Sequence, residues 1–156
     1  MISKITQTTL WSDGTRGPNM AAVRLQPVEL GPLPNVMPCA FEELDAWKVA
    51  RELANEVYTL CRRLPLARDF GLCDQLRRAS VSVMNNIAEG WESRHPGEKL
   101  SFYNFARRSC GEVRSMSYVL LDNHFINECE QHRLRDHCIR SGMLVSGLIR
   151  SVETRN

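Results

Sequence analysis

The chain has 156 residues, of which 43% are hydrophobic and 24% are charged. These proportions supply a packed core for one domain and exclude a wholly disordered chain. A formal net charge of +2 lacks the strong basic excess of an obligate nucleic-acid binder. No apolar run approaches the roughly 18 residues of a membrane-spanning helix.

Residues 1–40 form a proline-rich leader. They hold five of the seven prolines and keep neither a helical nor a strand period. Because proline lacks an amide donor and restricts the residue before it, this stretch does not sustain a helix. We predict an extended or disordered leader over residues 1–40. Met37 is an alternative start of translation, and from that start the leader would not be made.

Residues 41–156 differ from the leader, because their apolar side chains recur at steps of three and four. This period is typical of helices that bury one face. It predicts four helices, over about residues 41–63, 69–89, 97–124 and from 128 onward. Short connections make neighbouring helices antiparallel. The predicted fold class is therefore all-α: an up-down-up-down antiparallel four-helix bundle over 41–156, with a non-helical, Pro-rich N-terminal arm.

Local signals mark the ends of these helices. Pro65 ends the first helix and Pro96 precedes the third. Gly90 stands where a left-handed C-cap would end the second helix. Asn127, with Glu130 three residues later, matches a capping box at the start of the fourth.

The six cysteines show no disulfide or zinc framework. None forms C-x-x-C, and no pair has zinc-finger spacing. Most lie in helical patterns, where a free cysteine packs as a small buried hydrophobe. We therefore predict reduced thiols and a cytoplasmic protein. The N-terminus also lacks the apolar segment of a secretory signal.

Motifs for catalysis are sparse. A di-metal carboxylate bundle needs two Glu-x-x-His motifs, and the chain has one, Glu92-x-x-His95. There is no G-x-S-x-G, P-loop or G-x-G-x-x-G motif. We predict no catalytic residues, no metal site, no cofactor and no enzyme activity, and keep a metal- or thiol-dependent enzyme as an alternative. The metal alternative rests on histidines and cysteines of the fourth helix, at Cys129, His132, His137 and Cys138.

A polar stripe runs along the second predicted helix, directly beside its apolar stripe. Its members step by three and four, so they share one face of the helix: Gln75, Arg78, Ser82, Asn86 and Glu89. Two interpretations stay open. The stripe is an ordinary solvated face, or it is a partly buried seam that fixes helix register or a subunit contact, with Arg78 paired to a carboxylate.

The same segment carries a family resemblance. Residues 75–90 read QLRRASVSVMNNIAEG, which resembles the signature Q-(L/I)-R-R-A-x-x-S-(I/V)-x-x-N-(I/L)-(A/V)-E-G. This signature belongs to bacterial four-helix-bundle proteins first noticed as reading frames in intervening sequences of large-subunit ribosomal RNA genes. Residues 41–50 resemble the family's opening F-x-x-L-x-(V/A)-W-x-x-A. Ala106, Ser109 and Glu112 resemble its A-x-G-S-x-x-E in the third helix.

Two positions depart from the family pattern. Met84 stands where many relatives have proline, so we expect the second helix to lack the kink that proline causes. Arg108 stands at the usual small glycine of the third helix. A large cation there either prevents a close approach of helices or places the charge on a surface.

The resemblance implies a homopentamer with a central opening and no known catalytic activity. Similar proteins are accessory factors of diversity-generating retroelements, where a basic pentamer engages a reverse transcriptase and nucleic acid. We therefore expect a non-enzymatic oligomeric scaffold that binds RNA or DNA, or a nucleic-acid enzyme such as a reverse transcriptase. A protein-only adaptor is the alternative. The candidate interface seam is Gln75, Arg78, Ser82, Asn86, Glu89 and Gly90, and the candidate nucleic-acid contacts are Arg77, Arg107 and Arg108.

Overall fold

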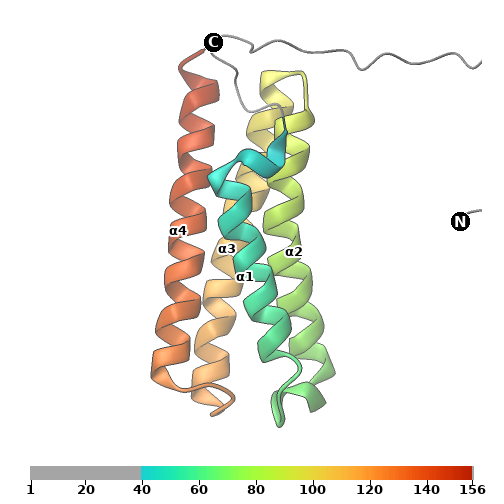
Figure 1. The fold of residues 1–156 in the computed structure, drawn as a ribbon, viewed down its shortest axis with the longest axis vertical. Coiled ribbons are helices and arrows are strands. Elements are labelled where there is room, and N and C mark those ends of the chain that lie inside the picture. Colours follow the sequence, from blue (N-terminus) through green and yellow to red (C-terminus); the bar gives the residue numbers. More distant parts are fainter. Residues whose placement is uncertain (1–39, 156) are drawn as a thin grey trace, which may run out of the picture. The chain divides into compact units, whose positions relative to one another are not determined.

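The computed structural model describes residues 40–155, which form four long helices (Figure 1) and no strand in that range. The helices are α1 (Asp45–Leu60), α2 (Phe70–Glu92), α3 (Pro96–Asp122) and α4 (Glu128–Glu153). Two short 3-10 helices, η1 (Phe41–Glu43) and η2 (Leu66–Arg68), precede α1 and α2. The predicted leader lies outside the described residues, apart from its last residue.

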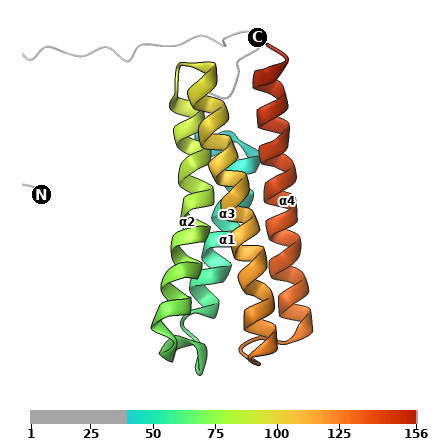
Figure 2. The same cartoon turned by 180° about the vertical axis from the view of Figure 1, so that it is seen from behind.

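Each long helix packs mainly against two others, in the cyclic order α1, α2, α3, α4 and back to α1. Figures 1 and 2 show consecutive helices running in opposite directions along a common axis. The predicted up-down-up-down four-helix bundle is therefore confirmed. None of the helices in the described part of the chain combines the length and apolarity needed to cross a membrane.

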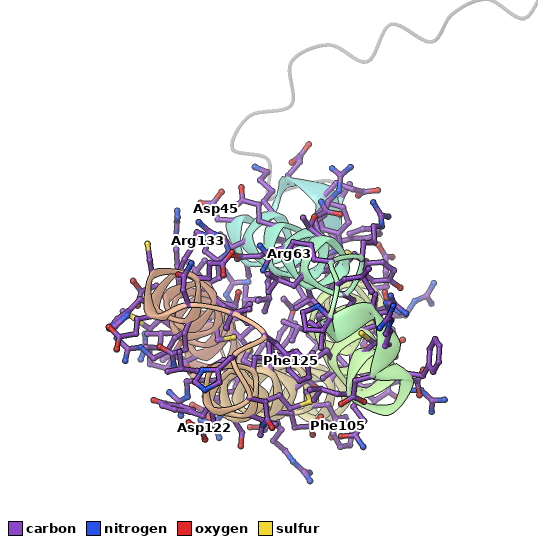
Figure 3. All side chains as sticks on the ribbon, turned by 90° about the horizontal axis from the view of Figure 1, so that it is seen from below. Asp45, Arg63, Phe105, Asp122, Phe125 and Arg133 are labelled. Atoms are coloured by element: carbon purple, nitrogen blue, oxygen red, sulfur yellow. The ribbon has the colours of Figure 1, made fainter. Side chains whose placement is uncertain are left out.

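The predicted apolar stripes form the core. Ala50, Val57, Leu76, Val83 and Ile87 are almost completely buried. Seen along the bundle, the four helices surround a filled interior, and Phe125 turns toward it from the connection between α3 and α4 (Figure 3). Burial of the valine, leucine and isoleucine side chains stabilises the fold by roughly 1.5–3 kcal/mol each.

Polar residues at stripe positions are also buried. Gln131 of α4 is 3% exposed and its amide donates to the hydroxyl of Ser117 on α3, at 3.4 Å. Ser117 in turn donates to the carbonyl oxygen of Arg114, at 2.7 Å. These bonds satisfy groups that would otherwise be costly to bury.

The helix ends differ in part from the prediction. The capping box at the start of α4 is confirmed: the Asn127 side chain accepts from the Glu130 amide at 2.9 Å, and Glu130 accepts from the Asn127 amide at 3.0 Å. The third helix ends at Asp122, earlier than expected. His124 in the following turn has a φ of 57°, which is left-handed and does not continue a helix.

The prediction that Gly90 caps the second helix is wrong. α2 continues to Glu92 with Gly90 inside it, and Gly90 is buried. A Cβ at this position would lie 2.4 Å from Cε1 of Tyr103 on α3. Glycine is needed here because the tyrosine ring occupies the space of a side chain, and not because the backbone turns left-handed.

Candidate functional site

The polar stripe of α2 divides into exposed and half-buried members. Gln75, Arg78 and Glu89 are exposed, whereas Ser82 and Asn86 are half-buried. Nε of Arg78 pairs with Oδ2 of Asp74 on the same helix at 2.9 Å, and the Arg78 side chain is 79% exposed. Arg78 therefore pairs with a carboxylate, as the seam interpretation expected, but within one chain this pair is exposed and not partly buried, because Asp74 lies one turn earlier on the solvent side.

The inner part of the stripe links α2 to α3. The hydroxyl groups of Ser82 and Ser109 lie 3.0 Å apart. Nδ2 of Asn86 donates to the Ser82 carbonyl oxygen at 2.8 Å and to its hydroxyl at 2.9 Å. We call these three residues the Ser82–Ser109 network. It joins the signature segment of the second helix to the motif of the third.

The other members of the third-helix motif have different surroundings. Ala106 is completely buried, so α3 approaches its neighbours closely at this level. Glu112 is exposed, and no ion pair joins it to Arg108 within residues 40–155. The motif thus contributes one core residue, one residue of the Ser82–Ser109 network and one solvated carboxylate.

Arg77 ties α2 to the end of α1. Its guanidinium carbon lies 5.6 Å from the ring centre of Tyr58, and Nη2 donates to the carbonyl oxygen of Cys61 at 3.3 Å. The side chain is half-buried, and its Nε has no hydrogen-bond partner among the described atoms. Arg77 is therefore held against the end of α1 by one hydrogen bond and one cation–π contact, beside a groove that Tyr58 of α1 and residues of α2 line.

Arg107 and Arg108 point to different surroundings. Arg108 is exposed, and its guanidinium lies 5.9 Å from the ring centre of Phe105, which sits at the edge of the bundle (Figure 3). Of the two outcomes expected for this departure from the family pattern, the structure has the charge on the surface. At Met84, the second departure from the family pattern, α2 continues without interruption, as expected in the absence of proline.

Arg107 lines a groove between α3 and α4, together with Arg114 and Arg150. All three arginines are exposed. Because this groove and that of Arg77 lie between different, opposite pairs of helices, the structure does not bring the three predicted nucleic-acid contacts together. Arg114 was identifiable from sequence, since seven residues from Arg107 is two helical turns on one face. Arg150 was not, because only the packing of α4 on α3 brings it there.

The two shortest ion pairs of the described residues lie on the α1–α4 side. Arg133 Nε lies 2.7 Å from Glu56 Oε1, and His137 Nδ1 lies 2.9 Å from Glu56 Oε2. Arg63 Nη1 lies 2.6 Å from Glu130 Oε1. The hydrogen bond from Arg63 and the N-cap bond hold the pKa of Glu130 below its ordinary value. Figure 3 shows Arg63 and Arg133 on this side.

The thiols and histidines do not converge. Burial raises the pKa of Cys61, Cys110 and Cys138 to about 12, which keeps these thiols protonated at neutral pH. His132 contacts its own helix at the Glu128 carbonyl oxygen, at 2.7 Å. Within residues 40–155, no group of three His, Cys, Asp or Glu side chains has the proximity to hold a metal ion. The described cysteines are free.

Known proteins place this chain in a family. The family model of the 23S rRNA-intervening sequence protein matches residues 42–147. The chain belongs to this family. The match spans the signature of α2 and the motif of α3, so the resemblance proposed from these residues is confirmed. No curated protein matches the chain.

A solved structure has a similar fold. It is a protein with unknown function from the S23 ribosomal protein family of Bacteroides thetaiotaomicron VPI-5482, and it aligns with a TM-score of 0.62. The alignment covers 67% of this chain and 95% of that chain, at 16% identity. At this identity the comparison shows a shared bundle fold for the intervening sequence protein and says nothing of its ligand.

Proposed function

We propose that this intervening sequence protein is a cytoplasmic, non-enzymatic oligomeric scaffold that binds nucleic acid, either RNA or DNA. The observation that carries the proposal is the group of exposed arginines on α3 and α4. Arg107, Arg114 and Arg150 have no ion pair within the described residues. Guanidinium groups that are not neutralised by carboxylates are available to phosphate. The family description, which names 23S rRNA intervening sequences, agrees with such a role.

The chemistry of three buried thiols supports a non-enzymatic role. A cysteine nucleophile acts as a thiolate, whereas Cys61, Cys110 and Cys138 are buried and have a pKa of about 12. The arginines are better suited to holding an anionic partner than to a reaction.

The proposed assembly is a homo-oligomer, a pentamer by the family resemblance. The exposed part of the seam supports a role outside the single chain, since Gln75 and Glu89 are exposed yet belong to the signature. Glu89 lines the same groove as Arg77, together with Tyr58 and Asn86. A ring of identical chains would present each weak phosphate contact several times and raise the overall affinity. Light scattering tests the assembly: a pentamer has five times the 17.8 kDa mass of the chain.

A salt titration tests the nucleic-acid function. Fluorescence anisotropy of the full chain with unrelated RNAs, at about 50 and 200 mM salt, should show binding that weakens steeply as salt rises. Absence of binding at the lower salt would refute the nucleic-acid function and leave the protein-only adaptor.

The adaptor alternative also has a structural observation in its favour. Phe70 is 80% exposed, and Phe105 and Tyr118 are about half exposed. Exposed aromatic side chains are enriched where proteins bind proteins. In this alternative the partner is a nucleic-acid enzyme such as a reverse transcriptase, and its binding would be insensitive to added RNA.

A further inference from the structure

The groove between α3 and α4 combines cationic side chains with an exposed apolar surface. Arg107 and Arg114 come from α3 and Arg150 from α4, while Met143 and Ile139 lie between them. Resting on the proposed function, we infer that this groove is the binding site for single-stranded nucleic acid. In it the arginines contact phosphates and Met143 contacts the bases.

The charges lie on both walls of the groove. Seven residues separate Arg107 from Arg114, which is about 10 Å along α3 at about 1.5 Å per residue, so the two cations can contact different phosphates of one strand. Arg150 lines the same groove from α4. No acidic residue of the described chain is among the groove's lining residues. The positive potential is therefore not cancelled locally, and it concentrates anions in the groove.

The apolar residues favour a nucleic acid over an acidic peptide. Met143 is 68% exposed and Ile139 is 38% exposed. A thioether makes favourable contacts with aromatic rings, and a single nucleic-acid strand supplies a ring with every phosphate. An acidic peptide supplies carboxylates without such rings. A duplex hides its base faces in the stack, so Met143 favours the single strand.

The charge of the leader does not complement the cationic groove. Residues 1–39 contain Lys4, Arg16 and Arg24 against Asp13 and Glu29. A segment with more cations than anions would not neutralise three arginines. The ligand that complements the groove is therefore a separate, strongly anionic molecule.

Two triple variants of the full chain test the cationic walls. The groove variant carries Arg107→Gln, Arg114→Gln and Arg150→Gln. The control variant carries Arg62→Gln, Arg68→Gln and Arg94→Gln. These three arginines are exposed, lie outside the groove and have no ion pair among the described residues. With a short oligouridylate, the groove variant should lose at least about tenfold in affinity at about 50 mM salt, and its salt slope should fall by about 2. The control should stay within about threefold of the wild type. Unchanged circular dichroism checks the fold.

A second pair of variants tests the base contact. Met143→Ser should weaken binding of oligouridylate and leave the salt slope unchanged, because the lost contact carries no charge. Leu64→Ser is the matched control, since Leu64 is 67% exposed but lies in the connection between α1 and η2, outside the groove. It should bind like the wild type.

The outcomes separate this inference from the proposed function. If the wild type binds RNA but the two triple variants lose affinity equally, the groove assignment is wrong and the nucleic-acid function stands. If the wild type binds no nucleic acid at about 50 mM salt, the proposed function itself fails. Equal affinity for duplex RNA would overturn the base contact. Displacement of oligouridylate by polyglutamate at equal charge concentration would reassign the groove to an acidic protein.

Discussion

The hydroxyl of Ser82 lies 3.0 Å from the hydroxyl of Ser109, and the two residues come from separate motifs on α2 and α3. Asn86 completes the contact by donating to both the carbonyl oxygen and the hydroxyl of Ser82. The polar stripe on α2 thus has a specific partner on α3. The contact fixes how far α2 is rotated and shifted relative to α3.

Loss of the Asn86 amide should destabilise the protein. Asn86→Ala removes two hydrogen bonds at a half-buried site, and we expect a loss of about 1–2 kcal/mol in urea denaturation. Arg78→Ala is the control from the same stripe. Its side chain is exposed and pairs with Asp74 of the same helix, so the change should stay below about 0.5 kcal/mol. Equal effects at both positions would contradict the division of the stripe.

Arg133 is not an inert surface position. It pairs with Glu56, whose side chain is only 11% exposed. We expect Arg133→Ala to destabilise the protein by more than Arg78→Ala, by about 1 kcal/mol, because a mostly buried carboxylate loses its charged donor. Denaturation of the two variants at neutral pH checks this order.

Acid should weaken the contact between Arg63 and Glu130. The hydrogen bond from Arg63 lowers the pKa of Glu130 in the folded chain. A lowered pKa means that this stabilisation is present above the ordinary glutamate pKa of about 4.3 and is lost as the pH falls through the lower, folded value. Arg63→Gln should therefore lose less stability than the wild type between about pH 6 and pH 3. An identical pH dependence would show that the pair is not coupled to folding. Arg78→Gln, which breaks an exposed pair, should keep the wild-type dependence.

Removal of the leader should leave the bundle unchanged. The proline content of residues 1–36 and their lack of period motivate this prediction. A chain that starts at Met37 should keep its helical circular dichroism and its Tm. A fall in Tm of more than a few degrees would show that the leader packs on the helices.

Replacement of Arg107 and Arg108 should measure the electrostatic contribution to nucleic-acid binding. Replacing both should weaken binding to unrelated RNAs by similar factors, because the chain has no recognisable base-reading motif. If each contacts a phosphate, the salt slope should fall by about 0.7 for each lost contact on single strands. Single replacements then separate the groove arginine from the one beside Phe105. Sequence-dependent losses would instead indicate a base-specific site.

Features that depend on one helix could be predicted from the sequence, whereas features that depend on contacts between helices could not. The stripes of apolar residues and the capping box at Asn127 depend on neighbours within one helix, so they were predictable. Gly90 was misassigned because its role depends on Tyr103, which lies on another helix. Arg150 joins Arg107 only through the packing of α4 on α3. The candidate site was therefore predictable one helix at a time, and its assembly was not.

Gly90 and Tyr103 also constrain how this family can vary. The ring fills the space that a side chain at position 90 would need, so Gly90→Ala should lower the free energy of unfolding by about 1 kcal/mol or more through overpacking. Gly111→Ala, with no atom near its added Cβ, should raise it by about 0.5–1 kcal/mol through helix propensity. During evolution a larger residue at 90 is acceptable only after the residue at 103 has become smaller. The two positions should therefore covary among homologues, and the smaller residue at position 103 has to arise first.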